Sequence, residues 1–428
     1  MISDDLTPLA AEDARILALG TGPIRCHTLK VLVIENPPGD AVVDELRAEI
    51  ARRLPGARRW QQRLVPAPGT PAGLAWQDDP DFDIAQHVRA ASSSEPADDA
   101  RLRRILADIM VGELDRDRPL WTIDVVPRLA DGRWAIVWKV HHCLADGMAM
   151  MRAGSRLLWT EDAARAKRPA PAAPAKVSAG KLATLAGHRG LVLREFRRVW
   201  RLSPLAAEVG AARAMAFAQC SLDELRALGK AVGPDVTIND VLLAVIAGAL
   251  RQWREPRHTR MKAQVPVSMH TLDEAAGNRD SFLLVELPVG EDDPIARVRA
   301  VSHATRVRKH RHDAQAIYTL RESLSRAPAI VRRALQRLVQ GPHEYSLNIS
   351  NVPGPAGPIH VLGRRVAAVY PFAEIAPHHA LRVAAASVSG SLGIGLTADP
   401  HAIPDLDVLA AGIAGSVDEL RRRLVRAA

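Results

Sequence analysis

The sequence predicts two structural blocks, each an α/β or α+β layer built around a large sheet. Strand-like and helix-like stretches alternate in both halves of the 428-residue chain, and 47% of its residues are apolar, enough for a large core. The segment 163–187, AARAKRPAPAAPAKVSAGKLATLAG, has few large apolar residues and several prolines, as linkers do. We therefore expect an N-terminal block at 1–162 and a C-terminal block at 188–428.

In the first block, residues 28–35 (TLKVLVIE) and 133–140 (RWAIVWKV) are rich in β-branched residues and predict strands. Residues 100–114 predict a helix, because apolar residues return every three or four positions on one face. These residues are Leu102, Ile105, Leu106, Ile109 and Met110. Because aromatic residues make up only 4% of the chain, we expect Leu, Val and Ala to fill most of the core.

In the second block, residues 239–253 predict a mostly apolar helix that Thr237 opens. Residues 282–289, 345–350 and 382–388 predict strands. The longest apolar run, near 241–250, is well short of the ~18 residues needed to span a bilayer. The N-terminus is acidic where a secretory signal would be basic, so we expect a cytoplasmic protein.

Basic residues exceed acidic ones, 57 Lys and Arg against 48 Asp and Glu, which gives a formal net charge of +9. Such a charge favours an anionic partner. Zinc-finger, basic-zipper and aromatic RNA-binding signatures are missing, so we expect no nucleic acid partner. The remaining candidates for an anionic partner are phospholipid surfaces and phosphate-bearing substrates. Three scattered cysteines, Cys26, Cys143 and Cys220, are too few for a disulfide framework or a metal cluster.

Two segments, 191–202 and 330–339, place arginines beside apolar stripes. Such a helix can lie on an anionic membrane surface. The same pattern is also typical of a surface helix that packs its apolar stripe on the core. The first interpretation predicts a peripheral, salt-sensitive attachment to the inner face of the membrane or to lipid droplets.

The strand at 133–140 leads directly into the motif HHCLADG, residues 141–147. A neutral imidazole, with an ordinary pKa near 6.5, can take a proton from an alcohol and return it. The motif can therefore supply a general base for an acceptor hydroxyl. The alternative is a pair of buried histidines that ends a strand.

Asp146 follows His142 by four residues, past a turn. We expect it to hold the motif loop, paired with an arginine, rather than to move a proton. Gly147 suits a backbone with positive φ or a close approach of substrate. Cys143 is expected to be a packing residue, because its side chain alternates away from His142 and no neighbouring base would activate it.

The HHxxxDG pattern resembles the active-site motif of the acyl-CoA-dependent acyltransferase superfamily. Further blocks resemble bacterial wax ester synthase/diacylglycerol acyltransferases along nearly the whole chain. They are Pro119-Leu120-Trp121, Asn239-Asp240, Gly277-Asn278-Arg279 and Ser350-Asn351-Val352-Pro353-Gly354-Pro355, with the opening LTPLAAEDARILAL and the closing GLTADPHAIPDLDVLAAGI. The resemblance implies a two-lobed chloramphenicol acetyltransferase-like fold, with a tunnel between the lobes that CoA and acceptor enter from opposite mouths.

The resemblance also implies residues along the acyl or CoA channel: Asn351, Pro353, Asn239, Asp240, Pro119 and Trp121. For Asn351 the alternative is a turn-forming role, because prolines stiffen the segment around it. For Asn239 and Asp240 the alternative is helix capping.

Two stretches depart from the family pattern. Residues 387–390 read Ser-Val-Ser-Gly where the family commonly has Ser-Tyr-Asn-Gly, and the pair His378-His379 is not expected from the family. Both lie in the part thought to shape the acceptor side, so the identity of the acceptor stays open. The pair lacks the Asp-Gly continuation, and we expect it to be a polar loop pair.

The function that the resemblance implies is transfer of a fatty acyl group from CoA to a diacylglycerol or a long-chain alcohol. In this interpretation His142 is the general base and His141 shapes the site. The products would be triacylglycerol or wax ester, and free CoA. Acyl-CoA is then a co-substrate, and we expect neither a bound cofactor nor a metal. Two alternatives are a related enzyme that acylates another hydroxyl or an amine, and a non-catalytic lipid-surface protein, which the intact motif disfavours.

Overall fold

The computed structural model describes residues 6–20, 22–91, 95–162, 203, 205–253, 261–268, 280–310 and 344–427. Four predicted features lie outside these residues: the linker at 163–187, the basic segments at 191–202 and 330–339, and the Gly277-Asn278-Arg279 block.

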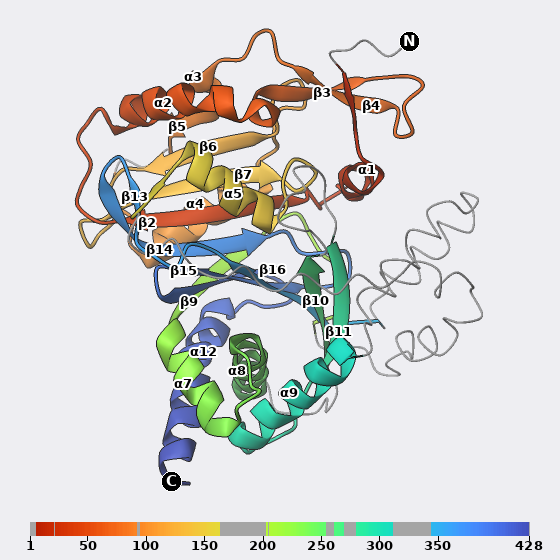
Figure 1. The fold of residues 1–428 in the computed structure, drawn as a ribbon, viewed down its shortest axis with the longest axis vertical. Coiled ribbons are helices and arrows are strands. Elements are labelled where there is room, and N and C mark those ends of the chain that lie inside the picture. Colours follow the sequence, from red (N-terminus) through yellow and green to blue (C-terminus); the bar gives the residue numbers. More distant parts are fainter. Residues whose placement is uncertain are drawn as a thin grey trace.

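Strands and helices alternate along the described residues (Figure 1). The strands are β1 (Thr7–Pro8), β2 (His27–Ile34), β3 (Gln62–Pro66), β4 (Leu74–Asp78), β5 (Val88–Ala90), β6 (Trp121–Val126), β7 (Trp134–His141), β8 (Thr160–Glu161), β9 (Ala214–Ser221), β10 (Met261–Ser268), β11 (Asp280–Leu287), β12 (Leu347–Pro353), β13 (Ile359–Val361), β14 (Arg364–Ala373), β15 (Leu381–Val388) and β16 (Ser391–Ala398). The helices are α1 (Ala11–Leu19), α2 (Val42–Arg53), α3 (Ile84–His87), α4 (Asp99–Val111), α5 (Gly147–Leu157), α7 (Leu222–Val232), α8 (Ile238–Trp253), α9 (Pro294–His310) and α12 (Leu406–Val425), with short 3-10 turns η1 (Leu54–Gly56) and η2 (Arg58–Gln61).

Two large sheets, stacked one on the other, organise the described residues (Figure 1). The seven-stranded sheet has the order β5-β6-β7-β2-β14-β13-β8, and the six-stranded sheet has the order β11-β10-β12-β15-β16-β9. A small sheet of order β1-β4-β3 accompanies them. Helices cover both large sheets, so the predicted class of mixed helix and sheet in two lobes is confirmed.

The chain does not fill the two sheets in strict sequence order. Strands β13 and β14 come from the C-terminal block but belong to the first sheet, where β14 runs antiparallel to β2. Strand β13 in turn pairs with β8 at the end of the N-terminal block. Residues 359–373 therefore complete the first lobe. The segment 163–187 divides the sequence into two blocks, but the two sheets do not follow this division.

The two sheets touch where β14 crosses β15 and β16. Strand β16 carries two glycines that face the backbone of β14. A Cβ atom at Gly393 would lie 1.9 Å from the carbonyl oxygen of Val369, and one at Gly395 would lie 2.0 Å from that of Pro371. Only glycine permits this approach, so the Gly-Ile-Gly sequence sets how closely the lobes pack.

Every residue of β2 is buried, because helices cover both faces of the first sheet. Leu29, Val31 and Val33 pack on the side of α4, whereas Leu32 and Ile34 pack on the side of α2 and α5. This is the period of two that a strand imposes on its side chains. The side on which a residue of β2 or β7 falls therefore decides which helix it meets.

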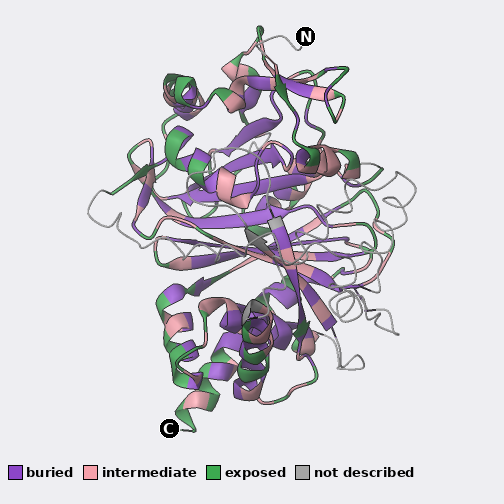
Figure 2. Cartoon of the chain, turned by 45° about the vertical axis from the view of Figure 1, so that its right-hand side comes forward, coloured by how far each residue is buried: buried purple, intermediate pink, exposed green. Residues whose placement is uncertain are grey.

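The cores of the two lobes differ in composition. Helices α7, α8, α9 and α12 pack on the second sheet (Figure 1), and buried residues line this packing (Figure 2). Leu, Val, Ile and Ala make up most of this core, as the low aromatic content predicts. Helix α8 is buried on every side along residues 240–250, which explains its mostly apolar sequence. The first lobe instead concentrates the tryptophans: Trp121, Trp134, Trp138 and Trp159 are fully buried there.

The predicted elements are present within a few residues of their expected bounds. The helix predicted at 100–114 is α4, and its first turn is capped by Asp98, whose Oδ1 accepts a hydrogen bond from the Arg101 N–H at 2.7 Å. In the described ranges, no helix combines the length and the hydropathy that crossing a bilayer requires.

Candidate active site

The paired histidines lie at the end of β7, held by the segments on both sides. The His141 N–H donates to the carbonyl oxygen of Leu120 at 3.0 Å, just before β6. The His142 N–H donates to the carbonyl oxygen of Cys26 at 2.9 Å, just before β2. Hydrogen bonds to both neighbours fix the backbone of the pair.

His141 is buried among other buried groups. Its Nδ1 accepts a hydrogen bond from the Cys143 N–H at 3.2 Å, so the neutral ring carries its proton on Nε2. The edge of the ring meets His27, with ring centroids 5.9 Å apart. Burial lowers the pKa of His141 to about 3. A ring held in this way suits a shaping role.

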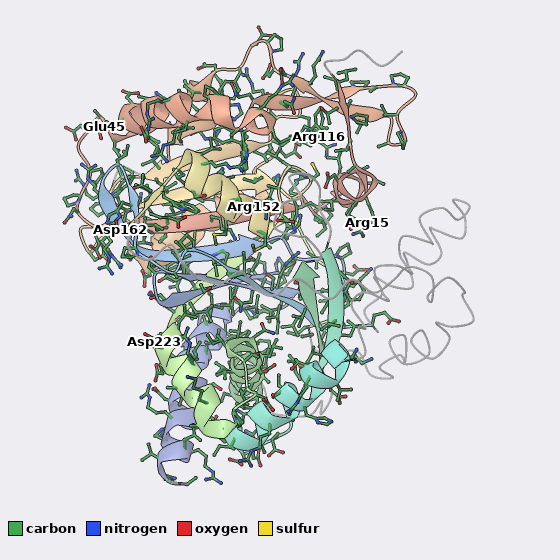
Figure 3. The ribbon with its side chains drawn as sticks, viewed as in Figure 1. Arg15, Glu45, Arg116, Arg152, Asp162 and Asp223 are labelled. Atoms are coloured by element: carbon green, nitrogen blue, oxygen red, sulfur yellow. The ribbon has the colours of Figure 1, made fainter. Side chains whose placement is uncertain are left out.

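His142 is partly exposed, in contrast to His141. Burial lowers the pKa of its imidazole, and the guanidinium of Arg382 on β15 lowers that pKa further. Asp146 opposes this effect, and Arg15, labelled in Figure 3, adds a smaller effect in the same direction as Arg382. The ring is therefore neutral at pH 7 and can accept a proton.

Asp146 is buried and caps α5. Its Oδ1 accepts a hydrogen bond from the Ala149 N–H at 2.7 Å, which satisfies one of the free N–H groups of the first turn. The carboxylate also stabilises the charge of Lys30 on β2, whose pKa burial lowers to about 8. Asp146 thus ties the motif loop to the helix that follows it.

Gly147 begins α5, and of the two reasons predicted for a glycine here, a positive φ does not apply. The reason is a close approach, but by protein rather than by substrate. A Cβ atom at Gly147 would lie 2.7 Å from Cγ2 of Val352 on β12. The motif of the first lobe therefore packs on the Ser350–Pro355 segment of the second.

Trp121 and Pro119 are both buried, next to the segment that holds the histidine pair. The ring of Trp121 stacks on His87 with centroids 4.5 Å apart, and its Nε1–H donates to the carbonyl oxygen of Trp60 at 2.8 Å. Leu120 lies between Pro119 and Trp121 in the sequence, and its carbonyl oxygen accepts the hydrogen bond from the His141 N–H at the end of β7. This block supports the histidine pair from the core.

Asn351 and Pro353 lie on β12, which runs parallel to β15. Pro353 is exposed. Oδ1 of Asn351 is buried and has no hydrogen-bond partner among the described residues. Buried acceptors are nearly always paired in folded proteins, so a substrate N–H or O–H group can complete this one.

Asn239 and Asp240 lie at the start of α8, and Asp240 is buried in structural contacts. Its Oδ2 accepts from the Thr237 hydroxyl at 2.8 Å, and its Oδ1 accepts from the Thr305 hydroxyl at 2.6 Å. These bonds cap α8 and join it to α9. Helix α8 lies on the side of the second sheet away from α5 (Figure 1). The structure therefore does not bring Asp240 to the histidines.

Several residues near the site could not be predicted from the sequence, because the pairing of strands determines which residues are their neighbours. His27 faces His141 across β2 and β7, and its Nδ1 lies 3.0 Å from the carbonyl oxygen of Met110. Arg213 and Glu374 form a buried ion pair with Nε and Oε1 2.6 Å apart. The signal in the sequence was Lys30, a charged residue inside a mostly apolar strand.

The two residues of the second histidine pair, His378 and His379, differ in exposure. His378 is exposed, with a φ of 61°. His379 is buried and stacks on Tyr345 with ring centroids 3.8 Å apart. Both residues therefore lie in the loop before β15, as expected, but the ring of His379 is buried.

Comparison with known proteins covers nearly the whole chain. A family model described as the wax ester synthase/diacylglycerol acyltransferase catalytic domain matches residues 9–202, and the C-terminal domain model of the same family matches residues 276–421. A protein of Mycobacterium tuberculosis named as a probable diacylglycerol O-acyltransferase is 31% identical over 464 residues, which cover 98% of this chain and 96% of that one. A second from that species is 30% identical and covers 93% of this chain and 96% of its own.

Solved structures show the same fold. The wax ester synthase/diacylglycerol acyltransferase of Marinobacter aquaeolei VT8 superposes with a TM-score of 0.74 at 24% identity, covering 98% of this chain and 100% of that one. The first condensation domain of the CDA synthetase superposes with a TM-score of 0.62 at 17% identity, covering 98% and 97%.

Proposed function

The chain belongs to the wax ester synthase/diacylglycerol acyltransferase family and is an acyltransferase, and from that premise we propose how its residues carry out the transfer. The donor is a fatty acyl-CoA, and the acceptor is the hydroxyl group of a diacylglycerol or a long-chain alcohol. The names of its relatives support this choice of substrates.

His142 is the general base of this proposal. It takes the proton of the acceptor hydroxyl as the oxygen attacks the thioester carbonyl, and it returns that proton to the departing CoA sulfur. The ester C–O bond forms and the thioester C–S bond breaks, so the products are the ester and free CoA. Its partial exposure and its neutral ring at pH 7 are the observations that support the role.

The other motif residues position this base. His141 would hold its neighbour through the backbone hydrogen bonds at the end of β7, and Asp146 would fix the loop as the cap of α5. Asn351 would line the channel, where its free amide oxygen suits the N–H donors of the pantetheine arm of CoA.

We also propose that the enzyme works on the surface of the inner membrane leaflet or of lipid droplets, because its acceptors and products do not dissolve in water. The net charge of +9 and the arginine-rich sequences at 191–202 and 330–339 support attachment to anionic lipid.

Cosedimentation of the protein with anionic liposomes should fall steeply by about 0.5 M salt, where the Debye length is below ~5 Å. Replacing Arg194, Arg197, Arg198 and Arg201 with Gln should weaken it. Equal recovery with neutral liposomes would contradict the proposal.

The function is tested by incubating the purified protein with palmitoyl-CoA and a panel of acceptors, and measuring thiol release and ester formation together. We expect both products to appear in equal amounts with diacylglycerols or long-chain alcohols, and neither with the His142→Ala variant. Ester or amide formation only with other hydroxyl compounds or amines would instead assign the enzyme a different acceptor. Thiol release without acylated product would contradict acyl transfer.

A further inference from the structure

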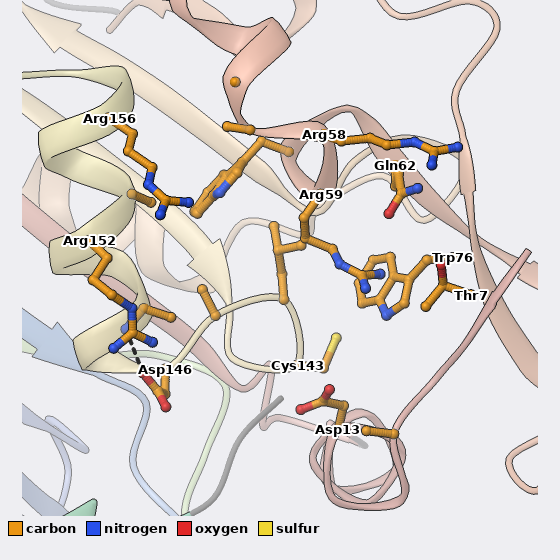
Figure 4. A pocket seen from close by; sticks show the side chains of 18 of the residues that line it. Thr7, Asp13, Arg58, Arg59, Gln62, Trp76, Cys143, Asp146, Arg152 and Arg156 are labelled. Carbon is orange, nitrogen blue, oxygen red and sulfur yellow. Dashed lines mark hydrogen bonds between the residues drawn. The ribbon is translucent and has the colours of Figure 1, made fainter. Parts of the chain in front are cut away.

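A cavity of about 480 Å³ lies against the motif loop, and His142 is not among the residues that line it (Figure 4). Its walls come from α1, from η2 and β4, and from one side of α5 along most of its length. Loop residues 143–146 form part of the wall. The charged lining side chains are Asp13, Arg58, Arg59, Asp146, Arg152 and Arg156.

Arg152 and Arg156 lie one turn apart on the same helix and extend toward the cavity (Figure 4). Both residues are exposed, and neither guanidinium forms a hydrogen bond or an ion pair within the part of the chain that the structure describes. Like charges at positions i and i+4 repel each other on a helix. This pair is therefore unfavourable for α5 unless an anion lies against it.

Arg59 lines the same cavity from η2. Its guanidinium lies over the ring of Trp76, 4.7 Å from the ring centroid. Its Nη1 is buried and has no hydrogen-bond partner among the described residues. Burial lowers the pKa of this guanidinium. A buried and unpaired charged donor is costly, so this atom also favours an acceptor in the cavity.

The other charged groups of the lining do not cancel these three arginines. Arg58 is paired with Asp78, with Nη2 and Oδ2 2.7 Å apart. Asp13 stabilises the charge of Arg59 from α1. Asp146 uses one oxygen to cap the helix. The end of the cavity formed by α5 therefore keeps an excess of positive charge.

We propose that this cavity binds a phosphate-bearing anion between Arg59 on one side and Arg152 and Arg156 on the other. Guanidinium groups bind phosphate oxygens through paired, charge-assisted hydrogen bonds. Because loop residues 143–146 belong to the wall, the anion also braces the loop that follows His142. The phosphate group is supplied by the CoA co-substrate, in which case the inference rests on the proposed function, or by a phospholipid headgroup.

Inorganic pyrophosphate, titrated calorimetrically into the full chain at low ionic strength, tests the site without any acyl transfer. We expect saturable binding that weakens at least tenfold in the double variant Arg152→Gln/Arg156→Gln. The matched control is Arg103→Gln/Arg104→Gln, which removes the same charge from α4 outside the cavity and should bind pyrophosphate as the parent does. No saturable binding by the parent, or equal weakening in both double variants, would overturn the proposal.

Circular dichroism checks that each variant is folded. If the α5 double variant is unstable, the single variant Arg156→Gln takes its place, with weakening of at least threefold expected and unchanged binding overturning the proposal. The His142→Ala protein should bind pyrophosphate like the parent. A failed acyltransferase assay would therefore leave this binding test intact.

Competition identifies the source of the phosphate. Displacement of pyrophosphate by CoA, and more weakly by dephospho-CoA, would assign the site to the 3′-phosphate of the co-substrate, and Arg152→Gln/Arg156→Gln should then raise KM for acyl-CoA. Displacement by vesicles that contain phosphatidate, with no effect of CoA, would assign it to a lipid headgroup.

Discussion

Gly147 of the histidine motif and Val352 of the Ser350–Pro355 segment are in direct contact, although they belong to different lobes and lie far apart in the sequence. The Val352 Cγ2 atom occupies the space that a Cβ atom on Gly147 would need, 2.7 Å away. A β-branched side chain cannot rotate freely out of the way. The contact thus couples the loop after His142 to the strand β12 that carries Asn351.

The Gly147→Ala substitution should therefore destabilise the protein by about 1–3 kcal/mol, as overpacking does, and lower turnover. Val352→Ala on the same chain should restore most of both, because it removes the clashing methyl group. Chemical denaturation and the acyltransferase assay measure the two effects. Gly39→Ala is the control, since a Cβ atom there meets nothing within 4 Å. Additive losses in the double variant would show that the two sites do not interact.

Replacing His142 with Ala should lower turnover by about 10²–10⁴ and leave the unfolding transition close to that of the parent, because a general base contributes about that much to rate. His141→Ala should cost less turnover but more stability, since it empties a buried position and removes the acceptor of the Cys143 N–H. The exposed His303 on α9 serves as a control. A larger loss of turnover in His141→Ala than in His142→Ala would reverse the assignment of roles.

The acid limb of the rate profile should lie below pH 6.5, because the pKa of His142 is lowered. Below that pKa the ring is protonated and cannot accept the hydroxyl proton. Measured with saturating acceptor, kcat/KM for acyl-CoA should stay flat from pH 8 to pH 6.5 and should fall about tenfold per pH unit only below the lowered pKa of His142. A midpoint above 6.5 would mean that the ring is not desolvated during the reaction.

Stability should also fall in acid, through the two histidines that are buried. Burial lowers the pKa of His27 to about 4 and that of His141 to about 3, whereas both titrate near 6.5 when the chain is unfolded. Between pH 6.5 and 4 the unfolded chain binds more protons than the folded one. The free energy of unfolding therefore decreases as pH falls, by up to about 1.4 kcal/mol per pH unit for each histidine. Urea denaturation at pH 7, 6 and 5 measures the slope, and His27→Gln should reduce it; an unchanged slope would mean that His27 is not buried neutral.

The two roles of Asp146 separate in two substitutions. Asp146→Asn keeps an acceptor for the Ala149 N–H but removes the charge near Lys30, whereas Asp146→Ala removes both. The alanine variant should lose about 1 kcal/mol more stability than the asparagine variant, which is the usual contribution of a cap. Thermal denaturation compares them. Equal melting temperatures with lost turnover in both would point to direct chemistry by the carboxylate.

The local features of this protein were readable from its sequence because neighbours along the chain create them. The β-branched run before His141 predicted β7, and the spacing of apolar residues predicted α4. The apolar run after Thr237 predicted α8, which is buried on all sides. The motif and the ordered family blocks identified the family and placed the histidine pair at a strand end.

Strand pairing and packing between the lobes were decided only in the tertiary structure, because they depend on residues distant in sequence. Strand β14 joins the first sheet, and Gly393 and Gly395 of the second sheet lie against the backbone of β14. The pattern of apolar residues along β14 does not predict this pairing. The pairing of β2 with β7 sets His27 beside His141, and His142, which follows the end of β7, is partly exposed. Periodicity shows which residues of a strand share a face. Which strands become neighbours depends on how the whole chain buries its apolar surface, so the surroundings of the motif follow only from the tertiary structure.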